Sequence, residues 1–345
     1  MESLIFAING TMPIVLVVAI GYILKRIGLM SADFASKANK LVFRVFLPVM
    51  LFLNVYKIED ISSIKVEFII FTALGVVAIF AVGIPFSMFI TKRPDRRGVM
   101  HQAVFRSNNA IIGVSLATLL AGLEGAIAAS ILSAVVVPIF NALGVVALSM
   151  YGERDGGDGE NSSESAPKGQ TRVKFPFKKI FIGIIKNPLI ISIALGFVAL
   201  GIRAILTALG SDFRISDIGA ISKTLDYLAS LATPLALIAL GGQFEFSAIG
   251  ELKKEIIAGT IARIILAPVL LIALAALIFG EGVSAGMYAA LVAVFATPVA
   301  VSTVPMSQEM GGDSRLAGQL VIFSTLFSSI TVFLFAFVLS LLGCL

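Results

Sequence analysis

Residues 104–122 read VFRSNNAIIGVSLATLLAG, and residues 295–313 read FATPVAVSTVPMSQEMGGD. Both stretches lie in long apolar runs, yet each carries polar or helix-breaking residues where a lipid-facing helix carries none. Asn108 comes about nine residues into its run, roughly 14 Å deep at 1.5 Å per residue, which is close to the bilayer midplane. Pro298 lies at a similar depth, lacks an N–H and clashes with the preceding turn. The two stretches therefore predict two membrane helices that are broken at mid-depth.

A broken helix exposes backbone ends inside the membrane, and the N-terminal ends carry partial positive charge and free N–H groups that suit an anion. The amides of Asn108 and Asn109 offer donors and acceptors, so they can cap a break and bind a ligand. Hydroxyl groups near Pro298 can satisfy the freed backbone. The candidate binding residues at the two breaks are Arg106, Ser107, Asn108, Asn109, Thr297, Pro298, Ser302 and Thr303. The alternative is a proline kink with packing asparagines and no ligand, but the matching positions favour a site.

Three arginines lie within the apolar runs. Arg106 adjoins the first break, where it can attract a substrate carboxylate. Arg263 follows Lys253 by about ten residues, too deep for its side chain to reach the interface easily, so it either pairs inside the protein or attracts an anion. Arg44 is near a helix end, where its side chain can reach the interface. Acidic residues are scarce in the middle of the runs, which argues against a sodium site built from carboxylates.

Composition places the whole chain in a membrane. The 345 residues have a mean hydropathy of +1.01, with 58% hydrophobic and 14% charged residues, against roughly 25% charged in a soluble domain. Cys344 and His101 are the only cysteine and histidine, which nearly excludes disulfide frameworks, thiolate or histidine metal sites and serine-histidine chemistry. We therefore expect no enzyme, no cofactor and no metal. The net charge of +5 does not indicate nucleic acid, because the basic residues lie in loops, where they set topology.

Ten apolar runs are each long enough, or nearly so, to cross a bilayer. They cover residues 4–24, 38–56, 68–91, 99–121, 126–150, 188–206, 225–242, 256–279, 285–306 and 316–342. The N-terminus lacks a basic region and a cleavage site, so the first run is expected to remain as a span and not to be a signal peptide.

The distribution of lysine and arginine predicts the orientation. If the chain begins outside the cell, nearly all loop lysines and arginines fall on the inner side, and the outer side holds only Lys57, Lys65, Arg203, Arg214 and Lys223. We therefore expect a multi-pass protein of the plasma or inner membrane with both termini external and Gly157 in the cytoplasm.

A polar loop divides the chain into two halves of five runs. Residues 153–170 are rich in glycine, serine and acidic residues, which predicts disorder, and the basic, aromatic residues 172–179 are expected on the inner lipid surface. We therefore assign a first repeat at residues 1–151, a cytoplasmic loop at 152–179 and a second repeat at 180–345.

Weak internal similarity supports two related halves. Pro48 follows Ser36 by twelve residues, and Pro234 follows Ser222 by the same spacing. Since each half has an odd number of spans, the second must be inverted relative to the first, as in many secondary transporters with a site at the repeat interface. The predicted fold is an all-α integral membrane protein of ten transmembrane helices, arranged as two inverted five-helix repeats with broken, crossing helices 4 and 9.

Four motifs resemble the auxin efflux carrier family, also called the membrane transport protein family, which includes plant auxin carriers and bacterial malonate or malate carriers. They are GYILKRIGL at residues 21–29, FLPVMLF at 46–52, FRSNNAIIG at 105–113 and TPVAVSTVPMSQEMGGD at 297–313. The resemblance extends over the whole chain, and the order and spacing of the motifs carry it.

The resemblance implies a fold like that of sodium/proton antiporters and bile-acid symporters, with a scaffold from spans 1, 2, 6 and 7 and an elevator-like transport unit from the rest. It also implies crossed breaks at Asn108 and Pro298, and it suggests a substrate contact for Asn54. One position departs from the family, because Ser115 stands where a proline is frequent.

We expect a carrier for a small organic anion, such as a dicarboxylate or an aromatic or amino-acid-derived carboxylate, bound at the crossover of helices 4 and 9. A sodium-coupled symporter of related fold and a non-transporting membrane sensor are the alternatives. The expected partners are the substrate and membrane lipid, with no nucleic acid, and a homodimer is left open.

Overall fold

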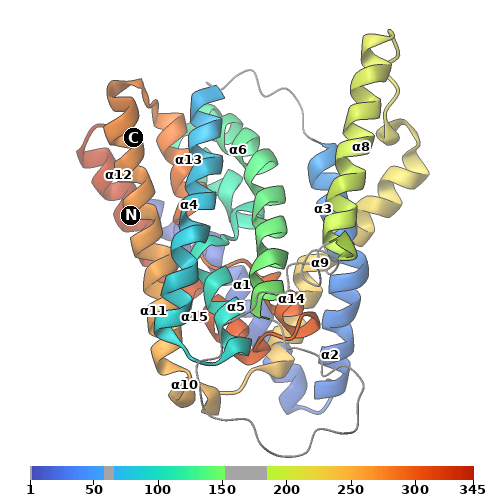
Figure 1. The fold of residues 1–345 in the computed structure, drawn as a ribbon, viewed down its shortest axis with the longest axis vertical. Helices are drawn as coiled ribbons and strands as arrows, with labels where there is room; N and C mark the ends of the chain where they lie inside the picture. The colour runs from blue at the N-terminus through green and yellow to red at the C-terminus, as the bar shows by residue number, and fades with distance from the viewer. Residues whose placement is uncertain (1, 58–65, 152–184) are drawn as a thin grey trace, which may run out of the picture.

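The computed structural model describes residues 2–57, 66–151 and 185–345 (Figure 1). Within these ranges every regular element is a helix, and the only β contact is an isolated bridge between Ser107 and Val299. The predicted all-α class is therefore confirmed. The predicted polar loop at residues 152–179 and Gly157 within it lie outside the described residues.

The first part of the chain forms eight helical segments. They are α1 (Glu2–Arg26), α2 (Ala32–Leu41), η1 (Val42–Phe46), α3 (Leu47–Tyr56), α4 (Val66–Ile90), α5 (Pro94–Phe105), η2 (Asn109–Gly113) and α6 (Val114–Tyr151). After the gap follow α8 (Pro188–Ala208), η3 (Ile215–Asp217), α9 (Gly219–Gln243), α10 (Ser247–Glu251), α11 (Lys253–Ile261), η4 (Ala262–Leu266), α12 (Ala267–Phe279), η5 (Gly280–Gly282), α13 (Ala285–Phe295), α14 (Thr303–Glu309) and α15 (Ser314–Leu341).

Seven helical stretches among the described residues are long and apolar enough to cross a membrane. They are residues 32–56, 66–90, 114–151, 188–208, 219–243, 253–279 and 314–341. Two of the other predicted runs, 99–121 and 285–306, do not qualify as single helices, because the first is divided between α5 and α6 and the second between α13 and α14. The runs that the sequence marks as abnormal are thus the ones in which the helix is interrupted.

Glycine and proline shape the long helices. The 38-residue α6 contains a sharp bend, where Gly122 has φ 56° and ψ −140°, a conformation that is essentially confined to glycine. The π-helical turns η1 and η4 end two residues before Pro48 and Pro268. Because proline has no N–H to donate, the turn before it widens. The N–H groups of Leu47 and Ala267 each donate to the carbonyl five residues earlier in the chain. Arg44 and Arg263 both lie in these widened turns.

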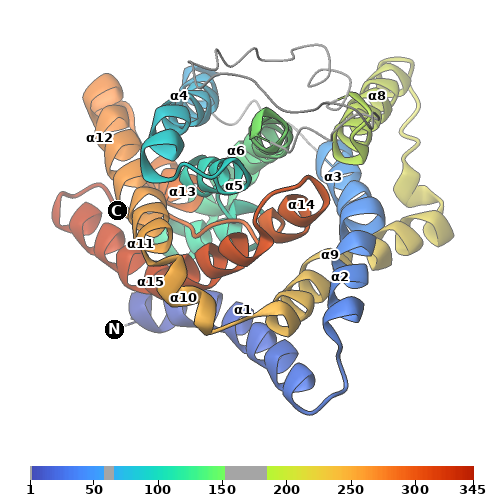
Figure 2. The same ribbon diagram turned by 60° about the horizontal axis from the view of Figure 1, so that its bottom comes forward.

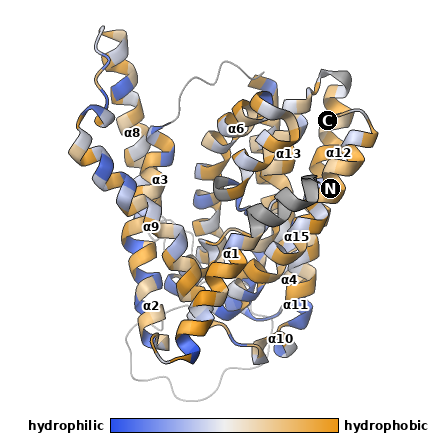
Figure 3. Ribbon diagram, turned by 180° about the vertical axis from the view of Figure 1, so that it is seen from behind, coloured by the Kyte–Doolittle hydropathy of each residue, from blue (hydrophilic) through white to orange (hydrophobic). Residues whose placement is uncertain are grey.

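Figures 1 and 2 show two groups of helices. The smaller group consists of α2, α3, α8 and α9, and the larger group consists of α4, α5, α6, α11, α12, α13 and α15. The short α13 lies in the core of the larger group against α6, and its residues 288–295 are all buried. Figure 3 shows that hydrophobic residues predominate along the helices, while hydrophilic residues are more frequent towards the helix ends. Large apolar side chains such as Phe89 and Leu277 are more than four-fifths exposed, as lipid-facing residues of a membrane protein are.

Candidate functional site

The two predicted breaks meet at the centre of the larger helix group. Helix α5 ends at Phe105 and α13 ends at Phe295, each close to the predicted position. The extended residues that follow run antiparallel: Asn108 donates its N–H to the Pro298 carbonyl at 2.8 Å, and Ala300 donates to the Arg106 carbonyl at 3.3 Å. Each break therefore satisfies backbone groups of the other, which a membrane interior requires.

Side chains from neighbouring helices complete the backbone pairing at the second break. Ser324 of α15 accepts a hydrogen bond from the Val299 N–H at 3.0 Å, and the Thr297 hydroxyl donates to the Ala293 carbonyl at 3.0 Å. Pro298 needs no donor because it has no N–H. The first break has no proline of its own, and its extended course depends on this pairing.

Arg263 lies at the C-terminal ends of both broken helices. Its guanidinium donates to the Val104 and Phe105 carbonyls at the end of α5, at 3.3 and 2.9 Å. It also donates to the carbonyls of α13 and the turn after it: Val294 at 3.4 Å, Phe295, and Thr297 at 3.1 Å. The side chain is fully buried. A cation therefore compensates the partial negative charge of two converging helix ends, and of the two predicted roles the geometry favours pairing inside the protein.

A small cavity lies on the other side of the crossing, between the breaks and helices α3, α6 and α9. It is lined by Leu47, Met50, Arg106, Ser107, Asn108, Val137, Phe140, Asn141, Ala232, Thr233, Ala236, Ala300, Val301 and Ser302. Its volume of about 40 Å³ is enough for a few water molecules but not for an organic acid. The conformation described here is thus nearly closed around this space.

Arg106 is the only charged residue that lines the cavity. It is 1% exposed, and its guanidinium donates to the Asn141 oxygen at 2.5 Å, the Ser302 hydroxyl at 2.7 Å and the Gln102 oxygen at 2.8 Å. It also contacts the Met306 sulfur at 2.6 Å. All four partners are neutral, and no carboxylate pairs with Arg106 in the part of the chain that the structure describes. The site therefore holds a positive charge without a counter-ion.

Two further polar groups line the cavity without a partner. The Ser107 hydroxyl and the Asn108 side-chain nitrogen are buried and make no hydrogen bond. Both groups can donate a hydrogen bond, and both belong to the two residues that follow Arg106 in the sequence. The Ser107 hydroxyl and the Asn108 amide are therefore two donors for which the described structure provides no acceptor.

The structure brings only some of the predicted residues to this cavity. Arg106, Ser107, Asn108 and Ser302 line it, whereas Asn54, Asn109, Arg263, Thr297, Pro298 and Thr303 do not. Asn109 points to α6, where its amide nitrogen donates to the Ser133 hydroxyl at 2.9 Å. Sequence reasoning missed Gln102 and Asn141, although a glutamine one helical turn before Arg106 and an asparagine in the apolar α6 were signals that could have been used.

Helix α14 connects the cavity to the smaller helix group. Ser302 precedes it at the cavity, and Gln308 at its other end accepts from Asn39 at 3.0 Å and from Gln243 at 3.1 Å. The Gln308 amide also donates to the Ser36 carbonyl at 3.0 Å. Next to it, Glu309 pairs with Arg44 at 3.3 Å. A single short helix thus carries both a cavity residue and the polar contacts to α2, η1 and α9.

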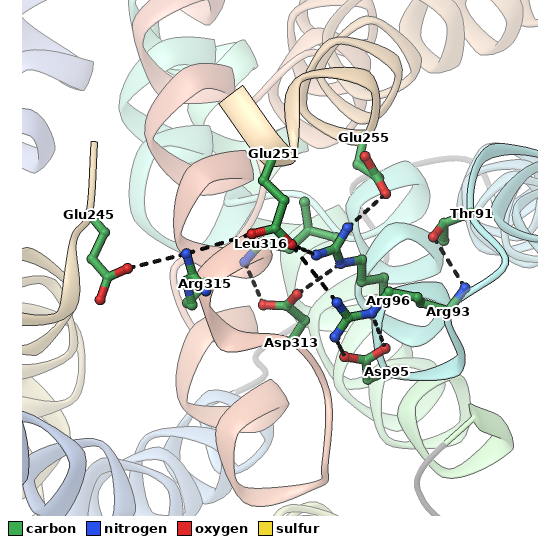
Figure 4. A network of polar contacts seen from close by, with 10 residues as sticks. All are labelled: Thr91, Arg93, Asp95, Arg96, Glu245, Glu251, Glu255, Asp313, Arg315 and Leu316. Carbon is green, nitrogen blue, oxygen red and sulfur yellow. Dashed lines mark hydrogen bonds and ion pairs between the residues drawn. The ribbon is translucent and has the colours of Figure 1, made fainter. Parts of the chain in front are cut away.

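An ionic network surrounds the N-terminal end of α5 (Figure 4). The buried Arg96 pairs with Asp313 at 3.0 Å, with Glu255 at 3.3 Å and with Glu251. Burial opposes the charge of Arg96, but these hydrogen bonds outweigh it and raise its pKa, while the Arg93 guanidinium lowers the pKa of Asp95. The network ties α5 to α10, α11 and the start of α15, so these elements form one unit.

A comparison with known protein families gives a match over most of the chain. The family model described as membrane transport protein matches residues 6–336 of the chain. No curated protein matches the chain.

Proposed function

The chain belongs to the membrane transport protein family, the auxin efflux carrier family, and from this premise we propose that it is a secondary carrier of a small organic anion. Family membership confirms the predicted resemblance and makes the chain a multi-pass membrane transporter. The family is one of transporters, in line with the expectation that the chain is not an enzyme. The nature of the substrate and the mechanism are our proposals.

The observation that carries the proposal is the buried Arg106 without a counter-ion. A guanidinium out of water is costly unless its charge is compensated, and its four partners are neutral. A carboxylate entering the cavity supplies that compensation, and its oxygens accept from Ser107 and Asn108 as well. We therefore assign substrate binding to Arg106, Ser107, Asn108 and Ser302.

The remaining wall of the cavity indicates the class of acid. Leu47, Met50, Phe140 and Ala236 are apolar, and no second cation lines the space. Thr233 and Asn141 also line the cavity, but a second carboxylate would be buried there without a cation to compensate its charge, at a cost of several kcal/mol. We therefore favour a monocarboxylate with an apolar body over a dicarboxylate, from among the acids that the sequence allowed. The cavity must widen to admit it.

For the architecture we propose ten spans in two inverted repeats, residues 1–151 and 180–345. The scaffold comprises α1, α2 to α3, α8 and α9, and the other helices move against it as in an elevator. The Gln308 and Glu309 contacts join the two units in this conformation, so they would break and re-form as the carrier turns over.

Counterflow into proteoliposomes tests the function. Vesicles loaded with an unlabelled monocarboxylate, such as phenylacetate, should accumulate the labelled acid transiently, and vesicles loaded with succinate should accumulate much less labelled succinate. A sodium requirement would favour the symporter alternative. Binding without any counterflow would identify a sensor and refute the carrier.

Asn108→Asp is expected to abolish binding of the transported acid. The substitution is nearly isosteric, but it places a negative charge beside the carboxylate, and like charges repel strongly in a buried site. Asn108→Ala removes only hydrogen bonds at about 1–3 kcal/mol, so affinity should fall roughly five- to a hundredfold. Isothermal titration calorimetry measures the affinity of the two variants and of the wild type for the acid. Anion binding by Asn108→Asp at wild-type affinity would place the site elsewhere.

The predicted orientation, with both termini outside the cell membrane, can be tested with two exposed glycines. A cysteine introduced at Gly250 in α10 should resist an impermeant maleimide in intact cells, and one at Gly219, at the start of α9, should react. Both positions have open space around the added side chain, and Cys344→Ser removes the native thiol. The reverse labelling pattern would invert the topology.

A further inference from the structure

An apolar groove runs along the outer face of the larger helix group, between α11 to η4 and α15. Its volume is about 500 Å³, and its lining is almost entirely aliphatic and aromatic. The residues that matter here are Ile257, Ile261 and Ile265 on one wall and Phe323 and Phe327 on the other, with Lys253 at one end. The isoleucines are 40 to 48% exposed, so no other element of the described chain covers them.

The groove has the length of one membrane leaflet. Twelve residues separate Lys253 from Ile265, which is about 18 Å along the helix at 1.5 Å per residue. Half of a hydrocarbon core is about 15 Å. The groove therefore extends from the polar surface, at Lys253, to mid-membrane depth, at Ile265.

Lys253 gives the groove a charge at its polar end. The neighbouring carboxylates Glu251 and Glu255 are occupied by Arg96 in the network of Figure 4. Lys253 makes no ion pair in the described structure, although it lines the groove. Its neighbour Lys254 is also exposed but does not line the groove. The groove thus combines one free cation with an apolar channel one leaflet long.

We propose that this groove binds an anionic phospholipid, with the phosphate at Lys253 and one acyl chain along the isoleucines. An acyl chain matches the length and apolar lining, and the lysine selects a negatively charged headgroup over a zwitterionic one. The deep end of the groove lies on η4, the turn that carries Arg263. The bound chain therefore packs against the outer side of the turn that holds the crossing helix ends.

Single-tryptophan quenching tests the proposal, because the chain contains no tryptophan. Ile265→Trp places the reporter in the groove, Ile261→Trp is a second groove reporter, and Leu277→Trp reports ordinary lipid on α12. The variants are reconstituted with lipids brominated on the acyl chain, either phosphatidylglycerol or phosphatidylcholine. At the groove reporters, half-quenching should need about fivefold less phosphatidylglycerol than phosphatidylcholine, and Leu277→Trp should show no preference.

The two lysines supply the matched control. Lys253→Gln in the Ile265→Trp background should abolish the preference, and Lys254→Gln should leave it unchanged. Equal quenching by the two lipids, or a preference that survives Lys253→Gln, would overturn the proposal. Groove reporters that neither lipid quenches, beside normal quenching of Leu277→Trp, would show that protein, such as a second copy of the chain, fills the groove.

Discussion

Arg106→Gln is expected to lower the affinity for the transported anion by at least about thirtyfold and to abolish counterflow. Removing one partner of a buried, hydrogen-bonded charge pair costs about 2–5 kcal/mol, and each 1.4 kcal/mol is a factor of ten. The variant should fold, because glutamine can still bond to the neutral groups that surround Arg106, and a buried charge has been removed. Titration of the purified protein with the acid, together with its thermal unfolding, measures both effects.

Two companion variants show whether charge or geometry is responsible. Arg106→Lys keeps the positive charge but loses the planar fork that matches a carboxylate, so its affinity should fall between wild type and Arg106→Gln. Arg26→Gln, at the exposed end of α1, removes an arginine far from the cavity and should bind normally. Wild-type binding by Arg106→Gln would show that the cavity arginine is structural only.

The second large effect concerns stability. Arg263→Ala leaves five carbonyl groups at two converging helix ends without their donor. Each unsatisfied buried acceptor costs about 1–3 kcal/mol, and partial relief by water or relaxation leaves an expected loss of about 3–5 kcal/mol. We expect a sharply reduced folded yield and a lower melting temperature in detergent, with transport lost as a consequence.

Arg263→Lys separates stability from binding. An ammonium group keeps the charge at the helix ends and reaches fewer carbonyls, so an intermediate melting temperature is expected. Because Arg263 does not line the cavity, the folded Arg263→Lys protein should bind the anion nearly as well as wild type. Normal expression, melting temperature and uptake in Arg263→Ala would contradict the helix-end role.

The positions of the breaks could be predicted because a polar group inside an apolar run is a local signal. Arg106, Asn108 and Pro298 needed no knowledge of their neighbours. The role of Arg263 stayed open, because its acceptors are backbone carbonyls on α5 and α13, more than 30 residues away in sequence. Backbone acceptors leave no trace in side-chain composition.

Other features depended on packing that a single sequence does not reveal. The cavity takes part of its wall from α3 and α9, and Asn141 reaches Arg106 only because α6 packs against the crossing. Asn109, next to Asn108, turns away from the cavity because consecutive residues of a helical turn point in different directions. The bend at Gly122 falls between two predicted runs, 99–121 and 126–150, so hydropathy located this interruption, but the close contact between the two helical parts of α6 did not follow from it.

The buried guanidinium of Arg106 places an uncompensated positive charge in the empty binding site. If the unit that holds it moves across the membrane field, the membrane potential acts on this step with about 2.3 kcal/mol per 100 mV for a full crossing. A bound monocarboxylate would compensate the charge of Arg106, whereas the charge of Arg263 would move with the empty and the loaded unit alike, so the loaded unit would cross with less electrical work than the empty one. On this proposal, the empty site would be drawn to face inward in a cell with a negative interior, and it would bind its anion there. The voltage would then drive export through the return of the unloaded protein.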